Sequence, residues 1–165
     1  MKPAISRRHV LLGGAAATVT LALAACTSSA TPDPNGPPPT GADDPDFTLR
    51  TSVVAAEALL IATYDATIAA HPDAKAELQT IRDNHAAHLA AVNTAGSISV
   101  PTPQAPQIPA SLKSAMRQLA AAEASAAAAR GSDCLAAQRW QFARELALVG
   151  ASEASHRALL TGGAA

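Results

Sequence analysis

The chain has 165 residues, of which 48% are hydrophobic and only 2% are aromatic, and its formal net charge is -1. A chain of this length predicts one domain, and its alanine-rich apolar content favours closely packed helices over a β-sandwich or barrel. Few aromatic side chains and a near-neutral charge exclude a nucleic-acid-binding surface, so nucleic acid is not an expected partner.

The first 26 residues are predicted to be an export signal that is not part of the fold. A basic start that contains Arg7 and Arg8 precedes an apolar run of about 16 residues, Val10 to Ala25. That run is too short to favour a stable membrane span. The paired arginines resemble a twin-arginine export signal, although Val10 stands where phenylalanine is commoner.

The end of this segment, Leu23-Ala24-Ala25-Cys26, resembles a bacterial lipobox. The resemblance implies that Cys26 becomes the new N-terminus and carries a lipid anchor on the outer face of the cytoplasmic membrane. The alternative is an ordinary signal with an incidental cysteine. Three basic residues leave with the signal and no acidic ones, so the net charge becomes -4. We therefore expect the acyl chains, rather than the protein surface, to bind the membrane.

Residues 27–46 are predicted to be a disordered tether, and residues 47–165 to be the folded domain. The tether is rich in serine, threonine, proline, glycine and aspartate and has almost nothing to bury. About 20 such residues reach roughly 25 Å, so the domain is expected to stand clear of the membrane.

The folded part is predicted to consist of four helices separated by proline and glycine. Asp73 is suited to cap the second helix, and Pro109 to the first turn of the third. The expected helices cover residues 48–70, residues 73–95, a third segment that begins at Pro109 and a fourth that ends near Thr161. The turn between the third and the fourth lies either at 131–133, where Gly131 suggests a break, or near residue 138.

The connection between the second and third helices, residues 96–108, contains three prolines and cannot be helical. Helices of about 23 residues are roughly 35 Å long, and about 13 extended residues reach about 43 Å. The connection can therefore cross the full length of the helices and start the third helix parallel to the second, which is typical of ferritin-like bundles. A plain up-down bundle with a loose loop is the alternative.

Each predicted helix places a glutamate or histidine on the stripe of large apolar residues that faces its neighbours. The stripe residues with metal-binding side chains are Glu57, His85, His88, Glu123, Glu153 and His156. An unpaired carboxylate in such a core costs several kcal/mol, and a metal ion resolves that conflict because it needs anionic oxygens and neutral imidazoles held together. A turn near residue 138 would bring Glu123 level with Glu153, whereas a turn at 132 would separate them by roughly 18–20 Å.

This pattern resembles the ferritin-like di-iron carboxylate bundles, which carry Glu, Glu-x-x-His, Glu and Glu-x-x-His on successive helices. Glu57, Glu123 and the run Glu153-Ala154-Ser155-His156 match, whereas His85-Ala86-Ala87-His88 has a histidine where a bridging glutamate belongs. The chain is also similar to alanine-rich actinobacterial lipoproteins with a ferritin-like domain of unassigned function. The resemblance covers about 115 residues and implies an all-α, ferritin-like four-helix bundle. His85 weakens the case for two irons and leaves one metal, a zinc or copper site, or no metal as alternatives.

The leading hypothesis is an exported, membrane-anchored lipoprotein that binds iron or another transition metal through these six residues. The first alternative is a metal-free lipoprotein that engages an envelope protein partner, and the second is a di-metal oxidase or peroxidase. The remaining polar and aromatic residues receive structural roles: Tyr64 is expected in the core, Trp140 and Phe142 in the core or as hairpin anchors, and Arg130 on a solvated face. The oligomeric state does not follow from the sequence.

Overall fold

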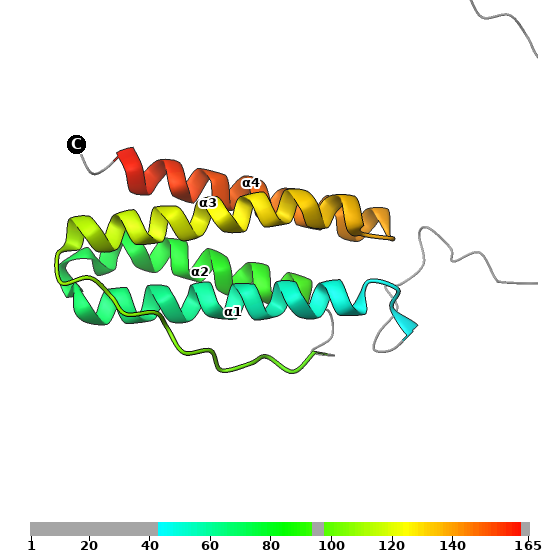
Figure 1. The fold of residues 1–165 in the computed structure, drawn as a ribbon, viewed down its shortest axis with the longest axis horizontal. Coiled ribbons are helices and arrows are strands. Elements are labelled where there is room, and N and C mark those ends of the chain that lie inside the picture. The colour runs from blue at the N-terminus through cyan, green and yellow to red at the C-terminus, as the bar shows by residue number, and fades with distance from the viewer. Residues whose placement is uncertain (1–42, 94–97, 163–165) are drawn as a thin grey trace, which may run out of the picture. The chain divides into compact units, whose positions relative to one another are not determined.

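The computed structural model describes residues 43–93 and 98–162. The predicted export signal with Arg7 and Arg8, the lipid-bearing Cys26 and the tether up to residue 42 lie outside these residues and stay predictions. The part of the chain that the structure describes is all-α (Figure 1). Its elements are α1 (Phe47–Ala70), the short 3-10 helix η3 (Pro72–Ala74), α2 (Lys75–Val92), α3 (Leu112–Ala136) and α4 (Trp140–Gly162).

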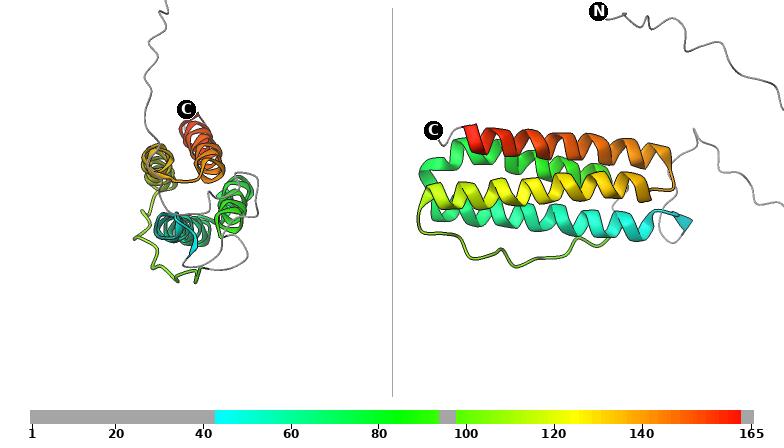
Figure 2. Two further views of the ribbon diagram at one scale, coloured as in Figure 1. Left: turned by 90° about the vertical axis from the view of Figure 1, so that its right-hand side faces the viewer. Right: turned by 45° about the horizontal axis from the view of Figure 1, so that its top comes forward.

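The four α-helices lie side by side along their lengths, and the end-on view of Figure 2 shows one helix at each corner of a square. Contacts join α1 to α2 and α3 to α4, and weaker contacts join α1 to α3 and α2 to α4. From residue 98 the chain runs extended along the outside to the start of α3 (Figure 1). As a result α2 and α3 point in the same direction, as the proline-rich connection predicts.

The observed helix boundaries differ from the predicted ones at three places. Asp73 does not cap α2, because it lies inside η3 and α2 begins at Lys75 without a side-chain cap. The second helix ends at Val92, and Asn93 then bonds through its side chain to both backbone groups of Ile98. The third helix begins after Pro109, at Leu112, because the Ser111 hydroxyl accepts from the Ser114 N–H as an N-cap.

The turn between α3 and α4 lies at residues 137–139, so the later of the two predicted positions is correct. Gly131 is inside α3, where a Cβ atom would have no neighbour within 4 Å. A glycine at an exposed helical position lowers stability only modestly, and the local break that it suggests is overridden by packing.

The core consists of two apolar clusters with a polar layer between them. The proximal cluster, near the start of α1, contains Val53, Val54, Val92, Ile98, Phe142 and Leu146. The distal cluster, near the turn between α1 and α2, contains Tyr64, Ala74, Leu78, Ile81, Met116, Leu119, Ala120 and Leu160. Along α1, α2 and α4 the predicted metal-binding residues come between members of these clusters, so the packing of both ends fixes the level of the polar layer.

The start of α1 is fixed by a buried ionic network that the sequence does not predict. The Arg50 guanidinium donates to Asp44 at 2.9 Å and to the Val92 carbonyl at 3.0 Å, and it lies over the Phe142 ring. The Asp46 carboxylate accepts from the backbone N–H groups of residues 138 and 139, at 2.7 and 3.0 Å. Asp44 and Asp46 are 5% and 2% exposed, so the folded part begins earlier than the predicted tether end at residue 46.

Two aromatic residues next to this network behave differently. Phe142 is buried, as predicted, whereas Trp140 is 58% exposed and does not belong to the core. Trp140 is the first residue of α4 and follows the exposed turn directly, which leaves its ring without a covering element.

Helix α1 is long and apolar enough to cross a membrane by length and composition alone, but 44% of its most apolar stretch is buried against the other helices. A core helix of a folded domain passes the same test. We therefore treat α1 as a core helix.

Candidate metal centre

The six residues that the sequence predicts as metal ligands lie at one level in the middle of the four helices. Glu57 comes from α1, His85 and His88 from α2, Glu123 from α3, and Glu153 and His156 from α4. Five of them are at most 2% exposed, and the His88 side chain is 15% exposed. Donor atoms of five of them form two groups that share His85, and within each group the atoms lie within 4.8 Å of one another; Glu153 lies in the same layer but belongs to neither group.

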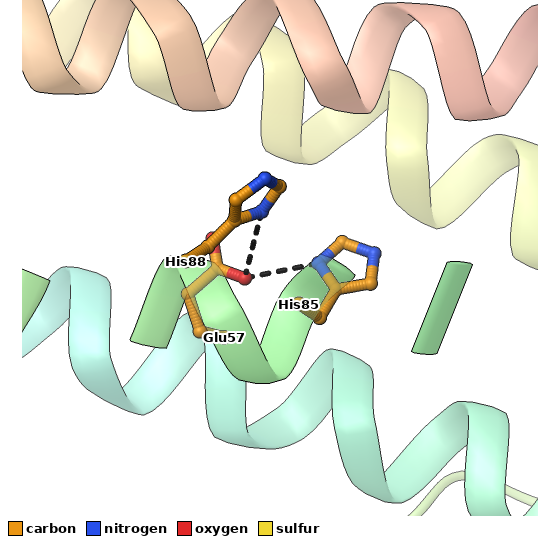
Figure 3. A group of neighbouring side chains, drawn as sticks. All are labelled: Glu57, His85 and His88. Atoms are coloured by element: carbon orange, nitrogen blue, oxygen red, sulfur yellow. Dashed lines mark hydrogen bonds and ion pairs between the residues drawn. The ribbon is translucent and has the colours of Figure 1, made fainter. Parts of the chain in front are cut away.

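The first group contains Glu57, His85 and His88 (Figure 3). One carboxylate oxygen of Glu57, Oε2, lies 2.9 Å from His85 Nδ1 and 3.7 Å from His88 Nδ1. The two histidines are three residues apart on α2, so both rings project from one face of the helix toward the carboxylate.

The second group contains His85, Glu123 and His156. Oε1 of Glu123 lies 2.8 Å from His85 Nε2 and accepts a 2.5 Å hydrogen bond from the Tyr64 hydroxyl, and Oε2 lies 3.5 Å from His156 Nδ1. The His85 ring is 5.2 Å from the His156 ring and 5.5 Å from the His88 ring, centroid to centroid. His85 therefore stands between the two groups and belongs to both.

His85 is positively charged in this arrangement. An ionised carboxylate can only accept hydrogen bonds, so both ring nitrogens of His85 must donate. Burial alone would lower the pKa of His85, but the hydrogen bonds and charges of Glu123 and Glu57 raise it to about 9. Burial would likewise raise the pKa of each carboxyl, but the neighbouring imidazoles, together with Tyr64 at Glu123, hold the pKa values of Glu57 and Glu123 at about 2.

Glu153, unlike Glu57 and Glu123, is held in its protonated form. Burial, followed by the negative charge of Glu57, raises the pKa of Glu153 to about 8, even though the Arg130 charge acts in the other direction. Both carboxyl oxygens of Glu153 are buried and lack a hydrogen-bond partner in the described structure. At neutral pH this group is therefore held mainly as the uncharged acid.

Arg130 is buried at the edge of the site, which contradicts its predicted place on a solvated face. It is 4% exposed, pairs with Asp133 at 2.8 Å and approaches Glu57 Oε1 at 3.9 Å. Gly150 of α4 lies directly against it, because a Cβ at Gly150 would lie 2.9 Å from the Arg130 Cβ. Arg130 follows Glu123 by seven residues, two helical turns, and this spacing is the signal that would have placed it near the site.

Several buried oxygen and nitrogen atoms in this layer have no hydrogen-bond partner in the described structure. Besides Glu153 they are Oε1 of Glu57, Oε2 of Glu123, Nδ1 of both His88 and His156 and, at the edge of the site, Nε and Nη1 of Arg130. Buried polar atoms without partners are rare in folded proteins and cost about 1–3 kcal/mol each. The two separations that are not hydrogen bonds, 3.5 Å between His156 Nδ1 and Glu123 Oε2 and 3.7 Å between His88 Nδ1 and Glu57 Oε2, are close to the spacing of ligands that share an ion. Donor atoms bonded to one metal at about 2.0–2.2 Å lie roughly 3–3.5 Å apart.

The sequence does not identify the groups that orient His156. The Asn84 side-chain amide lies 3.1 Å from His156 Nε2, and the Ser152 hydroxyl lies 3.3 Å from the same nitrogen. A metal on Nδ1 would leave the proton on Nε2, where the Ser152 hydroxyl or the rotated amide of Asn84 can accept it. Ser152 precedes His156 by four residues, which is the spacing that could have indicated it.

A surface pocket of about 470 Å³ lies between α2 and α4, and His88 is part of its lining. Arg144 and Glu145 line the same pocket. Of the six candidate ligands, His88 has the most exposed side chain and is the one that lines this pocket, so the pocket reaches the edge of the polar layer at His88.

Comparisons of the chain with protein-family models, curated proteins and solved structures find no match. The resemblance to ferritin-like bundles therefore rests on the pattern of residues alone and stays a prediction.

Proposed function

We propose that the chain is an exported, membrane-anchored lipoprotein whose helical domain is a ferritin-like bundle that binds a transition metal in its polar layer. The observation that carries the metal proposal is the set of buried carboxylate and imidazole atoms that lack hydrogen-bond partners. A bound divalent cation would give a partner to the unpartnered atoms of the group that holds it and offset the cost of burying carboxylates there.

The ligand types narrow the choice of metal. Three imidazoles and three carboxylates form a more nitrogen-rich set than the four carboxylates and two imidazoles of di-iron bundles. Imidazole suits zinc, copper, iron and nickel, whereas magnesium and calcium prefer oxygen ligands. The site therefore favours zinc or copper over magnesium or calcium.

Elemental analysis tests the proposal on the full-length chain, purified with detergent after expression in media supplemented with each metal in turn. We expect metal to be retained through gel filtration and to be lost from a variant that combines His88→Leu with His156→Leu. His71→Gln is the matched control, because His71 lies on the same hairpin but bonds to the Pro109 carbonyl outside the polar layer. Metal content near zero in every medium would refute the metal proposal.

The lipid anchor requires its own test. Growth with labelled palmitate should label the wild-type chain and leave a Cys26→Ser variant unlabelled and outside the membrane fraction. Replacement of Arg7 and Arg8 by lysine should reduce export if the twin-arginine route is used. A labelled Cys26→Ser protein would exclude the predicted lipidation site.

A metal-free role with an envelope protein partner is the second candidate, and the charge balance of the layer favours it. The negative charges of Glu57 and Glu123 face the His85 imidazolium, Glu153 is held protonated, and Arg130 is paired with Asp133 at 2.8 Å. Without an ion the layer therefore keeps one unmatched negative charge, fewer than its three carboxylates would carry if all were ionised. Such a layer predicts that the His88→Leu and His156→Leu variant is at least as stable as the wild type in every metal solution.

A further inference from the structure

We propose that the polar layer holds two metal ions rather than one, and that the His85 ring bridges them as an imidazolate. This inference rests on the proposed metal-binding function and deepens it. It concerns the number of ions and the chemical nature of the bridge, which the pattern of ligand types does not determine.

The geometry around His85 carries the proposal. Its two nitrogens face opposite partners, with Nδ1 2.9 Å from Glu57 Oε2 and Nε2 2.8 Å from Glu123 Oε1. A single ion cannot bind both nitrogens of one ring, because their lone pairs point away from each other. Two ions can, and the two candidate groups of the described residues share His85 and no other member.

Each side of His85 is equipped with the same kinds of ligand. One side offers Glu57 and His88 Nδ1, and the other offers Glu123 and His156 Nδ1. Glu153 adds a carboxylate with two unpartnered oxygens and is fully buried. Each ion would then have three protein ligands, and Glu153 would supply a further ligand to the layer.

The charges of the doubly loaded layer balance. Two divalent ions carry four positive charges, and Glu57, Glu123, Glu153 and the His85 imidazolate carry four negative ones. Arg130 keeps its own counter-ion, Asp133, at 2.8 Å. Loading releases two protons from the His85 imidazolium and one from Glu153 to solvent, and no electron is transferred.

The bridge also predicts the spacing of the ions. Carboxylate-bridged two-metal sites hold their ions about 3.5–4 Å apart. An imidazole ring between the ions sets them further apart but keeps them electronically coupled through the ring. Two Cu(II) ions joined in this way lose most of their electron paramagnetic resonance signal at low temperature, because their spins pair.

The test uses Cu(II) and Zn(II) as probes on the full-length chain. Equilibrium dialysis should give two ions per chain for the wild type and for His71→Gln, and one for His88→Leu and for His156→Leu. The doubly loaded copper protein should show a strongly reduced resonance signal per copper, and each singly loaded variant should show the full signal. Circular dichroism checks that the variants fold. If a variant does not fold, the resonance signal of the doubly loaded wild type still tests the imidazolate bridge.

The outcomes separate the two proposals. One ion per wild-type chain overturns the two-ion inference and leaves the proposed metal-binding function intact. Two copper ions with full, uncoupled signals overturn the imidazolate bridge. Absence of binding overturns both proposals.

Discussion

The two apolar clusters and the polar layer between them are buried to a similar degree, but they differ in how complete they are. The proximal and distal clusters fill their space with side chains of the chain itself. The polar layer places buried oxygens and nitrogens on both sides of His85 and leaves several of them without a hydrogen-bond partner among the described residues. The apolar clusters are therefore complete without a ligand, whereas the polar layer has atoms that a bound ion could partner.

This difference has a physical origin. Apolar contacts have no direction, so alanine, valine and leucine on four helices can complete a core by filling volume. Carboxylates and imidazoles need partners in fixed directions. The helices supply them for His85, for one oxygen each of Glu57 and Glu123 and for Nε2 of His156, but not for the atoms named above as unpartnered in the described structure. Changes in the clusters should therefore act independently of metal, whereas changes in the layer should depend on it.

The largest effect is expected from Leu146→Ala in the proximal cluster. Leu146 is fully buried, and removal of a buried leucine side chain costs about 3–5 kcal/mol because a cavity remains. Denaturant titration should give the same loss in chelator and in metal. Leu148→Ala is the control, because Leu148 is 60% exposed on the same helix and should change stability by less than about 0.5 kcal/mol. If the loss of unfolding free energy in Leu146→Ala differed between chelator and metal, the apolar clusters would not be independent of metal, which would contradict the comparison.

The His88→Leu and His156→Leu double variant should show the opposite dependence. At a metal concentration about 100 times Kd, the wild type should gain about 2.7 kcal/mol of unfolding free energy and the variant nothing. In chelator the variant should be as stable as the wild type or more so, because two imperfectly paired polar groups are gone. Thermal unfolding in zinc and in chelator measures both. An equal gain in wild type and variant would place the metal outside the layer.

The metal-free wild type should lose stability as the pH rises from 6.5 to 9. The folded pKa of His85 is raised to about 9 and that of Glu153 to about 8, so the folded state holds protons that the unfolded state has released. Denaturant titration should show a slope of about 1.4 kcal/mol per pH unit for each group that titrates between its unfolded and its folded pKa. Glu153→Gln should reduce the slope below pH 8 and leave the share of His85, which extends from pH 6.5 to about 9. Metal affinity should change in the opposite direction and rise with pH, since loading releases these protons.

The smallest effect is expected from Gly150→Ala. The new Cβ would lie 2.9 Å from the Arg130 Cβ, so α3 and α4 must separate slightly at the edge of the polar layer. Overpacking of this kind costs about 1–2 kcal/mol. Gly131→Ala is the matched control, because its Cβ meets nothing within 4 Å and should stabilise α3 by about 0.5–1 kcal/mol. Equal effects of the two substitutions would show that the contact at Gly150 imposes no constraint.

The sequence predicts the four helices, the long connection and the level of the polar layer correctly, because these follow from periodicity and from proline. The sequence leaves two positions open for the turn between the third and fourth helices, and the structure has the later one, which is the one that brings Glu123 level with Glu153. The ferritin-like identity of the bundle and the occupancy of the site stay predictions.

Other features depend on contacts that no local pattern contains. Asp46 resembles the residues of a tether, but it accepts hydrogen bonds from a turn more than 90 residues away in the chain. Arg130 resembles other surface arginines, and its burial depends on the close approach of Gly150 from the next helix. Propensity and composition describe a residue with its neighbours in sequence, and both cases are determined by neighbours in space.

The bonds between Asp46 and the turn at residues 137–139 have a mechanical consequence. Force that enters the domain from its N-terminal side meets Asp46 before it reaches α1, and two hydrogen bonds pass that load to the α3–α4 hairpin. The first helix therefore cannot be peeled away alone, because both hairpins share the strain from the start. A domain held by one end is in this way protected against unravelling from that end.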